Sequence, residues 1–459
     1  RPRERLYDAQ RPTTGITAIV KRYKVEAMEP IEITIIGVTL LAFAAVSRRL
    51  DSSPLTMPMV FVATGALMSA LNIVEVRAEI EAVGLLAEIT LAVILFSDAT
   101  RLSLPRVRRF IAIPGRLLGI GLPLTILAGA LVNFFLFDDW PWAQALLLAA
   151  VLAPTDAALG NAVLSDESVP TRDRLALNVE SGLNDGLVVP VVAVCTSLLL
   201  ETSRSTISWI GFVAQQIGFG ALAGALIGLG GIGVLRRARS AGWSDVRYEQ
   251  IATFALPVVA FCGAAALGGN GFIAAFGAGL AFGSGGLHRG VQADGDDMAG
   301  PKEAEHLAEF TEDAAELLGV ITFFVFGNLF VGDALGEFGP AVIIAALASL
   351  TIVRMIPVAI ALTGSGLDTA AKGFIGWFGP RGLASIVFGI LLLEELEERS
   401  ESADQLVGVI SLTVTLSVFL HGATAAYGAR RYGAHAADVE PLHEPVAMPR
   451  MRGGRQPQP

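Results

Sequence analysis

The chain has 459 residues, of which 53% are hydrophobic and 17% are charged, and its formal net charge is −10. Because an ordinary soluble domain has about 25% charged residues, this composition excludes a soluble globular protein and predicts a polytopic membrane protein. The negative net charge argues against a nucleic-acid partner. Both cysteines, Cys195 and Cys262, fall inside apolar runs, which excludes a disulfide framework and a zinc site.

The N-terminal segment, residues 1–27, is rich in Arg and Lys and precedes Met28 and the first apolar run. Two interpretations stay open for it. It is either a non-native or disordered leader, with Met28 as the natural start, or a genuine basic tail.

Apolar stretches of crossing length, which is about 20 residues, then predict about thirteen transmembrane helices within residues 28–427. They lie near 31–47, 54–74, 80–97, 111–136, 143–164, 176–200, 207–235, 250–267, 271–287, 313–331, 338–363, 373–394 and 405–427. The expected fold class is therefore an all-α integral membrane protein whose environment is the lipid bilayer. Residues 428–459, rich in Pro, Arg, His and Gly, are expected to form a disordered tail.

Basic residues concentrate in one set of alternate loops, including Arg48, Arg49, Arg108, Arg109 and Arg237. By the positive-inside rule this set faces the cytoplasm. The sequence thus predicts a multi-pass protein of the cell (plasma or inner) membrane with a cytoplasmic C-terminus.

The sixth predicted span contains an unusual group of polar residues. Glu180 and Asn184 are four residues apart, as are Ser181 and Asp185, so all four share one stripe of an α-helix. Ionisable groups inside a membrane span are costly, and they usually line an ion path or meet a partner. The stripe predicts a small-cation site in which Asp185 is the principal ligand.

Two predicted spans contain helix-breaking residues at the middle of the membrane. The fifth contains Pro154, directly before Thr155 and Asp156, and the twelfth contains Gly379-Pro380-Arg381-Gly382. Unwound backbone survives at this depth only where it faces protein or a wet cavity. Since the two breaks are an odd number of spans apart, their helices enter the membrane in opposite directions. This predicts two inverted repeats, spans 1–6 and 8–13, with two discontinuous helices that cross at a transport site.

The charged residues at the breaks invite a structural interpretation. Asp156 and Arg381 are expected to offset the exposed ends of the half-helices. Direct binding of the ion by Asp156 is the alternative.

These motifs together resemble the monovalent cation:proton antiporter family of the NhaP and NHE type. The resemblance rests on Pro154–Asp156 (PTD), Glu180–Asp185 (ESGLND), Arg354 and Gly376–Gly382 (GWFGPRG), and it covers about 31–427. Two departures from the family pattern are Ala157, where many members have proline, and Gly182, which is smaller than the usual residue.

The resemblance implies a homodimer with two parts in each subunit. The dimerisation part would comprise about 31–97 and 250–331, and the mobile core about 111–200 and 338–427, with a linker helix at 207–235.

The resemblance also implies roles for single residues. Asp185 would bind the cation or the proton, with help from Thr155 and Ser181, and Asn184 would accompany exchange without net charge. Glu180 would pair with Arg354, and because each alone would be an unpaired buried charge, we expect their ion pair to bridge spans 6 and 11.

The predicted function is secondary exchange of Na⁺ for H⁺ by competition for Asp185. A carboxylate offers a hard oxygen ligand to a cation, and burial favours its protonated form. Exchange of K⁺, or of Li⁺, stays open, and a passive cation channel is the weaker alternative because it needs a continuous wet pore. The sequence predicts neither an enzyme nor a cofactor. A GxGxxG match at Gly228–Gly233 lies in an apolar span with no preceding strand, so helix packing explains it better than a nucleotide.

Overall fold

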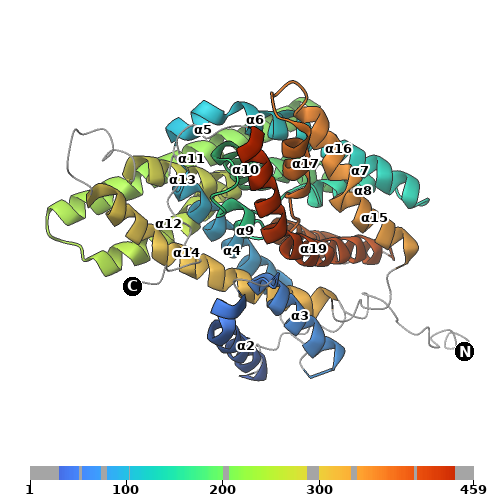
Figure 1. Ribbon diagram of the computed structural model, residues 1–459, viewed down its shortest axis with the longest axis horizontal. Helices are drawn as coiled ribbons and strands as arrows, with labels where there is room; N and C mark the ends of the chain where they lie inside the picture. Colours follow the sequence, from blue (N-terminus) through green and yellow to red (C-terminus); the bar gives the residue numbers. More distant parts are fainter. Residues whose placement is uncertain are drawn as a thin grey trace, which may run out of the picture.

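The computed structural model describes residues 30–50, 54–73, 80–102, 104–199, 206–286, 299–331, 339–396 and 401–439. Within these ranges the regular structure is helical and no strand occurs (Figure 1), which confirms the all-α prediction. The leader predicted at 1–27 lies outside the described residues.

The structure contains both long continuous helices and short helical segments. In chain order they are α2 (Pro30–Leu50), α3 (Met57–Ala70), α4 (Ile80–Thr100), α5 (Leu104–Phe110), α6 (Ala112–Arg116), a π-helical turn (Leu117–Gly121), α7 (Leu122–Leu136), α8 (Trp142–Val151), α9 (Asn161–Leu164), α10 (Thr171–Leu199), α11 (Thr206–Ser240), α12 (Val246–Ala266), α13 (Gly271–Gly286), α14 (Ala299–Phe326), a second π-helical turn (Gly327–Val331), α15 (Pro340–Leu350), α16 (Ile352–Ala361), α17 (Thr369–Trp377), α18 (Leu383–Leu396) and α19 (Glu401–Val439).

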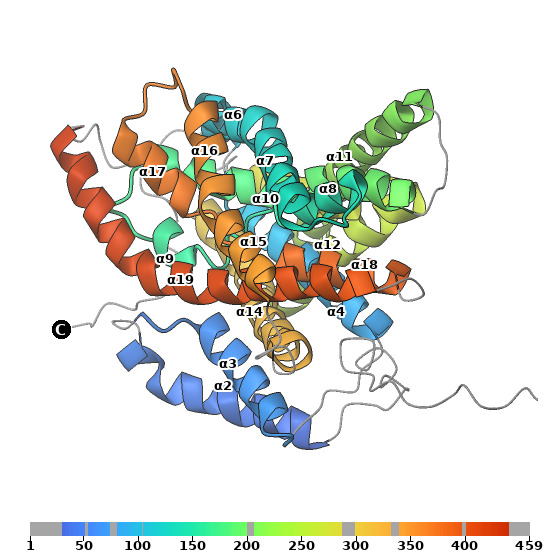
Figure 2. The same ribbon diagram turned by 90° about the vertical axis from the view of Figure 1, so that its right-hand side faces the viewer.

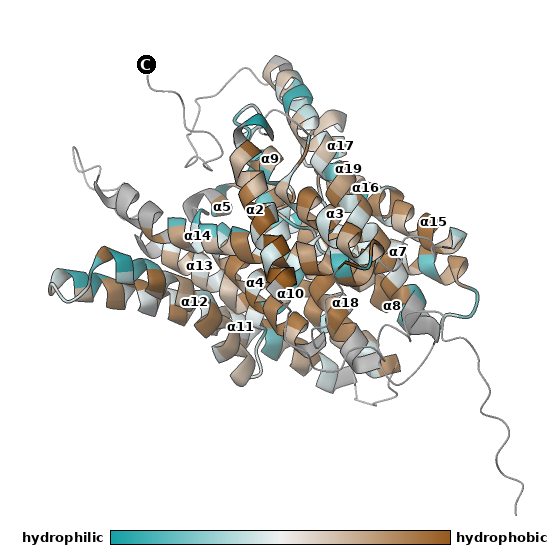
Figure 3. Ribbon diagram, turned by 90° about the horizontal axis from the view of Figure 1, so that it is seen from below, coloured by the Kyte–Doolittle hydropathy of each residue, from teal (hydrophilic) through white to brown (hydrophobic). Residues whose placement is uncertain are grey.

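Eight helical segments in the described ranges are long and apolar enough to cross a membrane, and shorter apolar helices accompany them. Leu222, Leu226 and Leu229 on α11 are each more than half exposed, as expected for side chains that face lipid. Figure 3 shows hydrophobic residues along most of the helices. The chain is therefore a multi-pass membrane protein.

The helices form two groups on either side of α10 and α4. In Figures 1 and 3, α11, α12, α13 and α14 lie on one side, and α7, α8, α15 and α16 lie on the other. Figure 2 shows α2 and α3 along a third side, next to α14 and α19. This arrangement puts the polar stripe of α10 in the middle of the molecule.

Small residues allow α11 and α13 to approach closely. A Cβ atom at Gly220 would overlap the backbone of Asn270, which directly precedes α13, and one at Gly224 or Gly228 would overlap Ala274 or Ala278 of α13, respectively. This is the small-residue packing typical of membrane helices. The glycine repeat is thus a packing surface, as the sequence predicted.

Both helices with predicted breaks are interrupted. The chain leaves the helical conformation after Val151 and resumes it at Asn161, and it leaves again after Trp377 and resumes at Leu383. Pro154 and Pro380 have no backbone N–H and cannot continue a helical hydrogen-bond ladder. The interruptions leave free backbone groups that other parts of the chain must satisfy.

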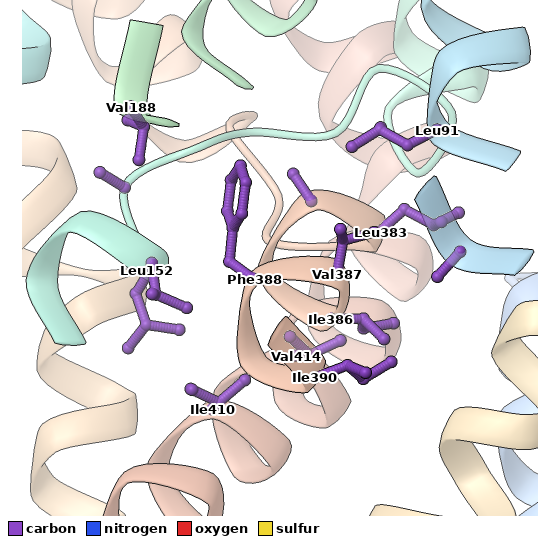
Figure 4. Close-up of a cluster of buried hydrophobic side chains, with 14 of the residues drawn as sticks. Leu91, Leu152, Val188, Leu383, Ile386, Val387, Phe388, Ile390, Ile410 and Val414 are labelled. Carbon is purple, nitrogen blue, oxygen red and sulfur yellow. The ribbon is translucent and has the colours of Figure 1, made fainter. Parts of the chain in front are cut away.

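The segment after the second break is fixed by apolar packing. Figure 4 shows α18 surrounded by side chains of other helices. The cluster includes Leu383, Ile386, Val387, Phe388 and Ile390 of α18, Ile410 and Val414 of α19, and also Leu91, Leu152 and Val188. Leu152 belongs to the first break, so this core holds the two breaks together.

One boundary differs from the prediction. The last helix, α19, continues to Val439, so residues 428–439 are helical and not part of a disordered tail. The reason is tertiary contact: the Tyr432 ring stacks on Phe374 with 4.1 Å between centroids, and its hydroxyl donates a 2.6 Å hydrogen bond to Asp173 Oδ2. Residues 440–459 lie outside the described part of the chain.

A second contact at this end of α19 gives a pH-dependent prediction. His435 Nε2 lies 2.6 Å from Asp368 Oδ2, and Ala371 N donates to Asp368 Oδ1 at the start of α17. The hydrogen bond with His435, followed by that from Ala371, holds the pKa of Asp368 below its ordinary value. The contacts therefore stabilise the fold above the unfolded-state pKa of about 3.9, and this stabilisation is lost as the pH falls through the lower folded-state pKa.

We expect Asp368→Asn to lower the melting temperature of the purified protein modestly at pH 7, because both groups are partly exposed. The difference from the wild type should shrink toward pH 3. Asp139→Asn, at an exposed loop position, is the control. An equal deficit at pH 7 and pH 3 would contradict the assignment.

Candidate functional site

The polar stripe of α10 is held in the core by close contact with α13. A Cβ atom at Gly182 would overlap the Phe276 ring, and one at Gly186 would overlap Ile273. The small residue at position 182 thus compensates for the aromatic ring opposite. On the stripe itself, Asn184 and Asp185 are only 1% and 3% exposed.

Three of the predicted ligand residues meet between α10 and the first break. Thr155 Oγ1 lies 2.9 Å from Ser181 Oγ, and Asn184 Nδ2 donates to Thr155 Oγ1 at 2.8 Å. Asn184 Oδ1 accepts no hydrogen bond from the described residues. The cluster therefore offers oxygen atoms at a point where the chain has no regular backbone structure.

Asp185 lies on the same helix face and has acidic neighbours. Its Oδ1 atom is buried and accepts no hydrogen bond from the described residues. The carboxyl groups of Asp156 and Asp98 both act on it electrostatically. Among the described residues no basic side chain forms an ion pair with this buried carboxylate, so a mobile cation or a proton can neutralise it.

Asp98 of α4 was not predicted from the sequence. Its electrostatic neighbours include Arg101 and Asp156. In the sequence it lies at the end of an apolar run and three residues before Arg101, so it looks like an ordinary helix-end charge. Only the packing of α4 beside the break brings it close to the site.

Asp156 links the two breaks through backbone groups. Its Oδ2 accepts a 2.8 Å hydrogen bond from Leu383 N, the first residue of α18, and its Oδ1 accepts one from Ala158 N at 2.8 Å. Its own backbone N–H donates to Pro380 O at 2.8 Å. The negative charge thus lies at the N-terminus of a half-helix, where the helix dipole favours it.

Arg381 makes the reciprocal contact from the second break. Its Nη1 donates to Ala153 O at 2.6 Å and to Pro154 O at 3.1 Å, just beyond the C-terminus of α8. A cation is favourable beside such free carbonyl groups. Ser385 Oγ adds a hydrogen bond to Val151 O at 2.9 Å. The breaks are therefore cross-linked by side chains in both directions.

Glu180 and Arg354 form a buried bidentate ion pair between α10 and α16. The two Nη–Oε distances are 2.5 and 2.8 Å, and both side chains are 2% exposed. A Cβ atom at Gly379 would overlap the Arg354 guanidinium group, so this group also lies against the second break. The ion pair therefore connects α10 to α16 and to the second break.

The contact between the two breaks leaves no room for a side chain at Gly382, which gives a testable prediction. A Cβ atom there would overlap the Asp156 carboxylate. Because overpacking of a tight core costs about 1–3 kcal/mol, we expect Gly382→Ala to lower the melting temperature. Gly373→Ala in α17 is the matched control, since a Cβ there meets no atom within 4 Å. If both variants have the melting temperature of the wild type, the two breaks are packed less tightly than these contacts imply.

The arrangement offers hard oxygen ligands. Among the described residues no three His, Cys, Asp or Glu side chains converge as a resident metal site requires. The site instead combines one unpaired carboxylate with hydroxyl and amide oxygens, which are hard ligands suited to small cations.

Comparison with known proteins supports this description. The model of the family described as sodium/hydrogen exchanger, transmembrane, matches residues 36–427. The chain is 25% identical over 388 residues to the Na⁺/H⁺ antiporter ApNhaP of Aphanothece halophytica, a match that covers 83% of this chain and 70% of the relative. It is 26% identical over 372 residues to the K⁺/H⁺ antiporter NhaP of Alkalimonas amylolytica, covering 79% of this chain and 61% of that one.

The fold also matches a solved structure. The sodium proton antiporter MjNhaP1 from Methanocaldococcus jannaschii, at pH 8, superimposes with a TM-score of 0.69 at 20% identity, covering 88% of this chain and 99% of that one. The family match extends over most of the chain and includes both breaks and α10. The chain therefore belongs to the sodium/hydrogen exchanger family of transmembrane cation/proton antiporters.

Proposed function

We propose that this protein exchanges a monovalent cation, in the first place Na⁺, for H⁺ by alternating access, and that the two ions compete for Asp185. The observation that carries the proposal is the position of this acid. It is a buried carboxyl with no ion-pair partner among the described residues, beside the oxygen cluster of Thr155 and Ser181, where two interrupted helices are cross-linked.

The coupling follows from the charge of the site. An unneutralised Asp185 resists transfer through the low-dielectric part of the protein, so only the cation-loaded or the protonated core changes sides. Thr155 and Ser181 supply oxygen ligands for the cation, and water completes its shell. Each full cycle then moves one cation one way and one proton the other way, which is exchange without net charge. Asn184, a neutral amide next to Asp185, supports this stoichiometry because it adds no second ionisable ligand.

The same proposal includes the wider architecture. About thirteen spans form two inverted repeats, in which α8 and α9 correspond to α17 and α18. The reciprocal contacts of Asp156 and Arg381 support this relation, since each carries a charge to the opposite break. The core comprises about 111–200 and 338–427, the dimerisation part of a homodimer about 31–97 and 250–331, and the linker helix 207–235. Basic loops support a cytoplasmic C-terminus in the cell membrane.

K⁺ is the second candidate cation. It is favoured by the relative from Alkalimonas amylolytica, which is named as a K⁺/H⁺ antiporter. A larger cation needs longer ligand distances, which the unwound backbone at Thr155 can provide.

The direct test uses purified protein in sealed vesicles that contain a pH-sensitive dye. Addition of Na⁺, K⁺ or Li⁺ outside should move protons out of preloaded acidic vesicles, with the largest rate for the physiological cation. The rate should be the same with the membrane potential clamped at zero or at a negative value. Absence of proton movement with every cation would reject exchange, and a rate that follows the voltage would reject exchange without net charge.

A further inference from the structure

The last transmembrane helix, α19, presents polar side chains to the second break. Ser417, His421 and Thr424 follow at intervals of four and three residues, so they share one helix face. Ser417 and His421 are 0% and 2% exposed. Buried polar groups at this depth need partners. Ser417 and Thr424 form hydrogen bonds with the break and with the end of α17, and the His421 ring packs against Trp377.

Ser417 holds the backbone of the break. Its Oγ accepts a 2.6 Å hydrogen bond from Arg381 N, an amide that the interrupted helix leaves without a helical partner. One turn further along, the His421 ring lies against the Trp377 ring with 4.9 Å between centroids. Trp377 in turn donates from Nε1 to Thr424 Oγ1 at 3.0 Å. Three contacts thus fix the end of α17 and the backbone of the break at Arg381 against α19.

The hydrogen bonds identify the atom through which His421 acts on Ser417. Ser417 Oγ already accepts from Arg381, and the same oxygen lies 3.2 Å from His421 Nδ1. The same Nδ1 atom lies 3.1 Å from the backbone carbonyl oxygen of Ser417, whereas Nε2 makes no hydrogen bond with the described residues. An unprotonated Nδ1 accepts from the Ser417 hydroxyl, and a protonated Nδ1 donates to the Ser417 carbonyl oxygen. In either tautomer, Nδ1 is the atom through which His421 contacts Ser417.

Arg381 connects Ser417 to the cation site. The backbone of Arg381 is held by Ser417, while its guanidinium group holds the carbonyls of Ala153 and Pro154. The next residue, Thr155, provides the hydroxyl that meets Ser181 and Asn184. We infer that Ser417 and His421 are positioning residues, which set the position of the Thr155 oxygen through Arg381 although neither touches the ion.

The inference rests on the proposed exchange function and predicts a specific kinetic effect. A loosened tether lets the Pro154–Thr155 backbone drift, which weakens cation binding. Ser417→Ala and His421→Gln should therefore raise the apparent KM for Na⁺ about tenfold in the vesicle assay and leave the maximal rate within about twofold. A merely structural role would instead reduce the amount of folded protein and the maximal rate without a change of KM.

A pair of conservative variants identifies the operative atom. The side-chain oxygen of asparagine can occupy the position of Nδ1, whereas that of glutamine reaches toward the position of Nε2. His421→Asn should therefore keep a KM within about twofold of the wild type, and His421→Gln should not. Ser411→Ala is the control for Ser417→Ala, because Ser411 is a buried serine of the same helix that lines a small, mostly apolar cavity away from the break.

The outcomes separate the two proposals. Wild-type protein that exchanges no cation for protons would reject the proposed function. An active wild type, with His421→Gln equal to His421→Asn or with Ser417→Ala equal to Ser411→Ala in KM, would overturn the positioning role alone. If Ser417→Ala fails to fold, the comparison of the two His421 variants still decides the question.

Discussion

Replacement of Asp185 by Asn is expected to abolish cation/proton exchange while the protein stays folded. The amide has nearly the shape of the carboxylate, but it carries no charge for a cation to neutralise and binds no proton near neutral pH. Asp185 is 3% exposed and its Oδ1 accepts no hydrogen bond from the described residues, so the substitution breaks no hydrogen bond at that atom. Removal of an unpaired buried charge should leave the melting temperature equal or higher.

The measurement compares proton fluxes driven by Na⁺ and by K⁺ in vesicles, with the folded fraction checked by size-exclusion chromatography. We expect a loss of at least about a hundredfold, as for removal of the sole ligand that binds both ions. Asp139→Asn, the same chemical change at an exposed loop position, should exchange like the wild type. Folded Asp185→Asn protein with substantial exchange would remove the central residue of the mechanism.

Substitution of either Glu180 or Arg354 should have the largest effect on stability. Each side chain is 2% exposed and the pair is bidentate, so removal of one partner leaves the other as an uncompensated buried charge. Loss of one member of such a pair costs about 3–5 kcal/mol. Glu180→Gln and Arg354→Gln should each lower the free energy of unfolding by this amount.

The double variant distinguishes pairing from independent effects. Because the double variant leaves neither charge unpaired, its decrease in the free energy of unfolding should be clearly smaller than the sum of the decreases in the two single variants. Denaturant unfolding in detergent micelles gives the three values. The partly exposed pair of Asp368 and His435 is the control, and its single variants should cost much less. Additive losses at Glu180 and Arg354 would show that the two charges are stabilised separately.

The sequence was sufficient to predict the elements of the site that depend on local spacing. Residues four apart on α10 share a face whatever surrounds the helix, so the position of Asp185 beside Ser181 follows from helix geometry. Proline at mid-membrane depth likewise interrupts a helix for a local reason, and both interruptions are observed at Pro154 and Pro380.

What the sequence could not give depends on contacts between distant segments. Asp98 resembles a helix-end charge until α4 is packed beside the first break. Ser417 resembles an ordinary small polar residue of an apolar helix until Arg381 N is placed against it, and His421 gains its role only through its contact with Ser417. The extension of α19 past residue 427 was missed for the same reason, because Tyr432 gains its partners from α10 and α17. In each case the role of the residue depends on a contact with a distant segment, which the composition of its own segment does not reveal.

The most direct test of the central claim is the apparent KM for Na⁺ as a function of pH, measured on the wild-type protein in vesicles with equal pH on both sides. If the cation and the proton compete for Asp185, KM should rise in proportion to the proton concentration on the acidic side of the profile, while the maximal rate extrapolated to saturating Na⁺ stays constant. A KM that is independent of pH, with a maximal rate that falls as the proton concentration rises, would mean that the two ions bind at separate groups.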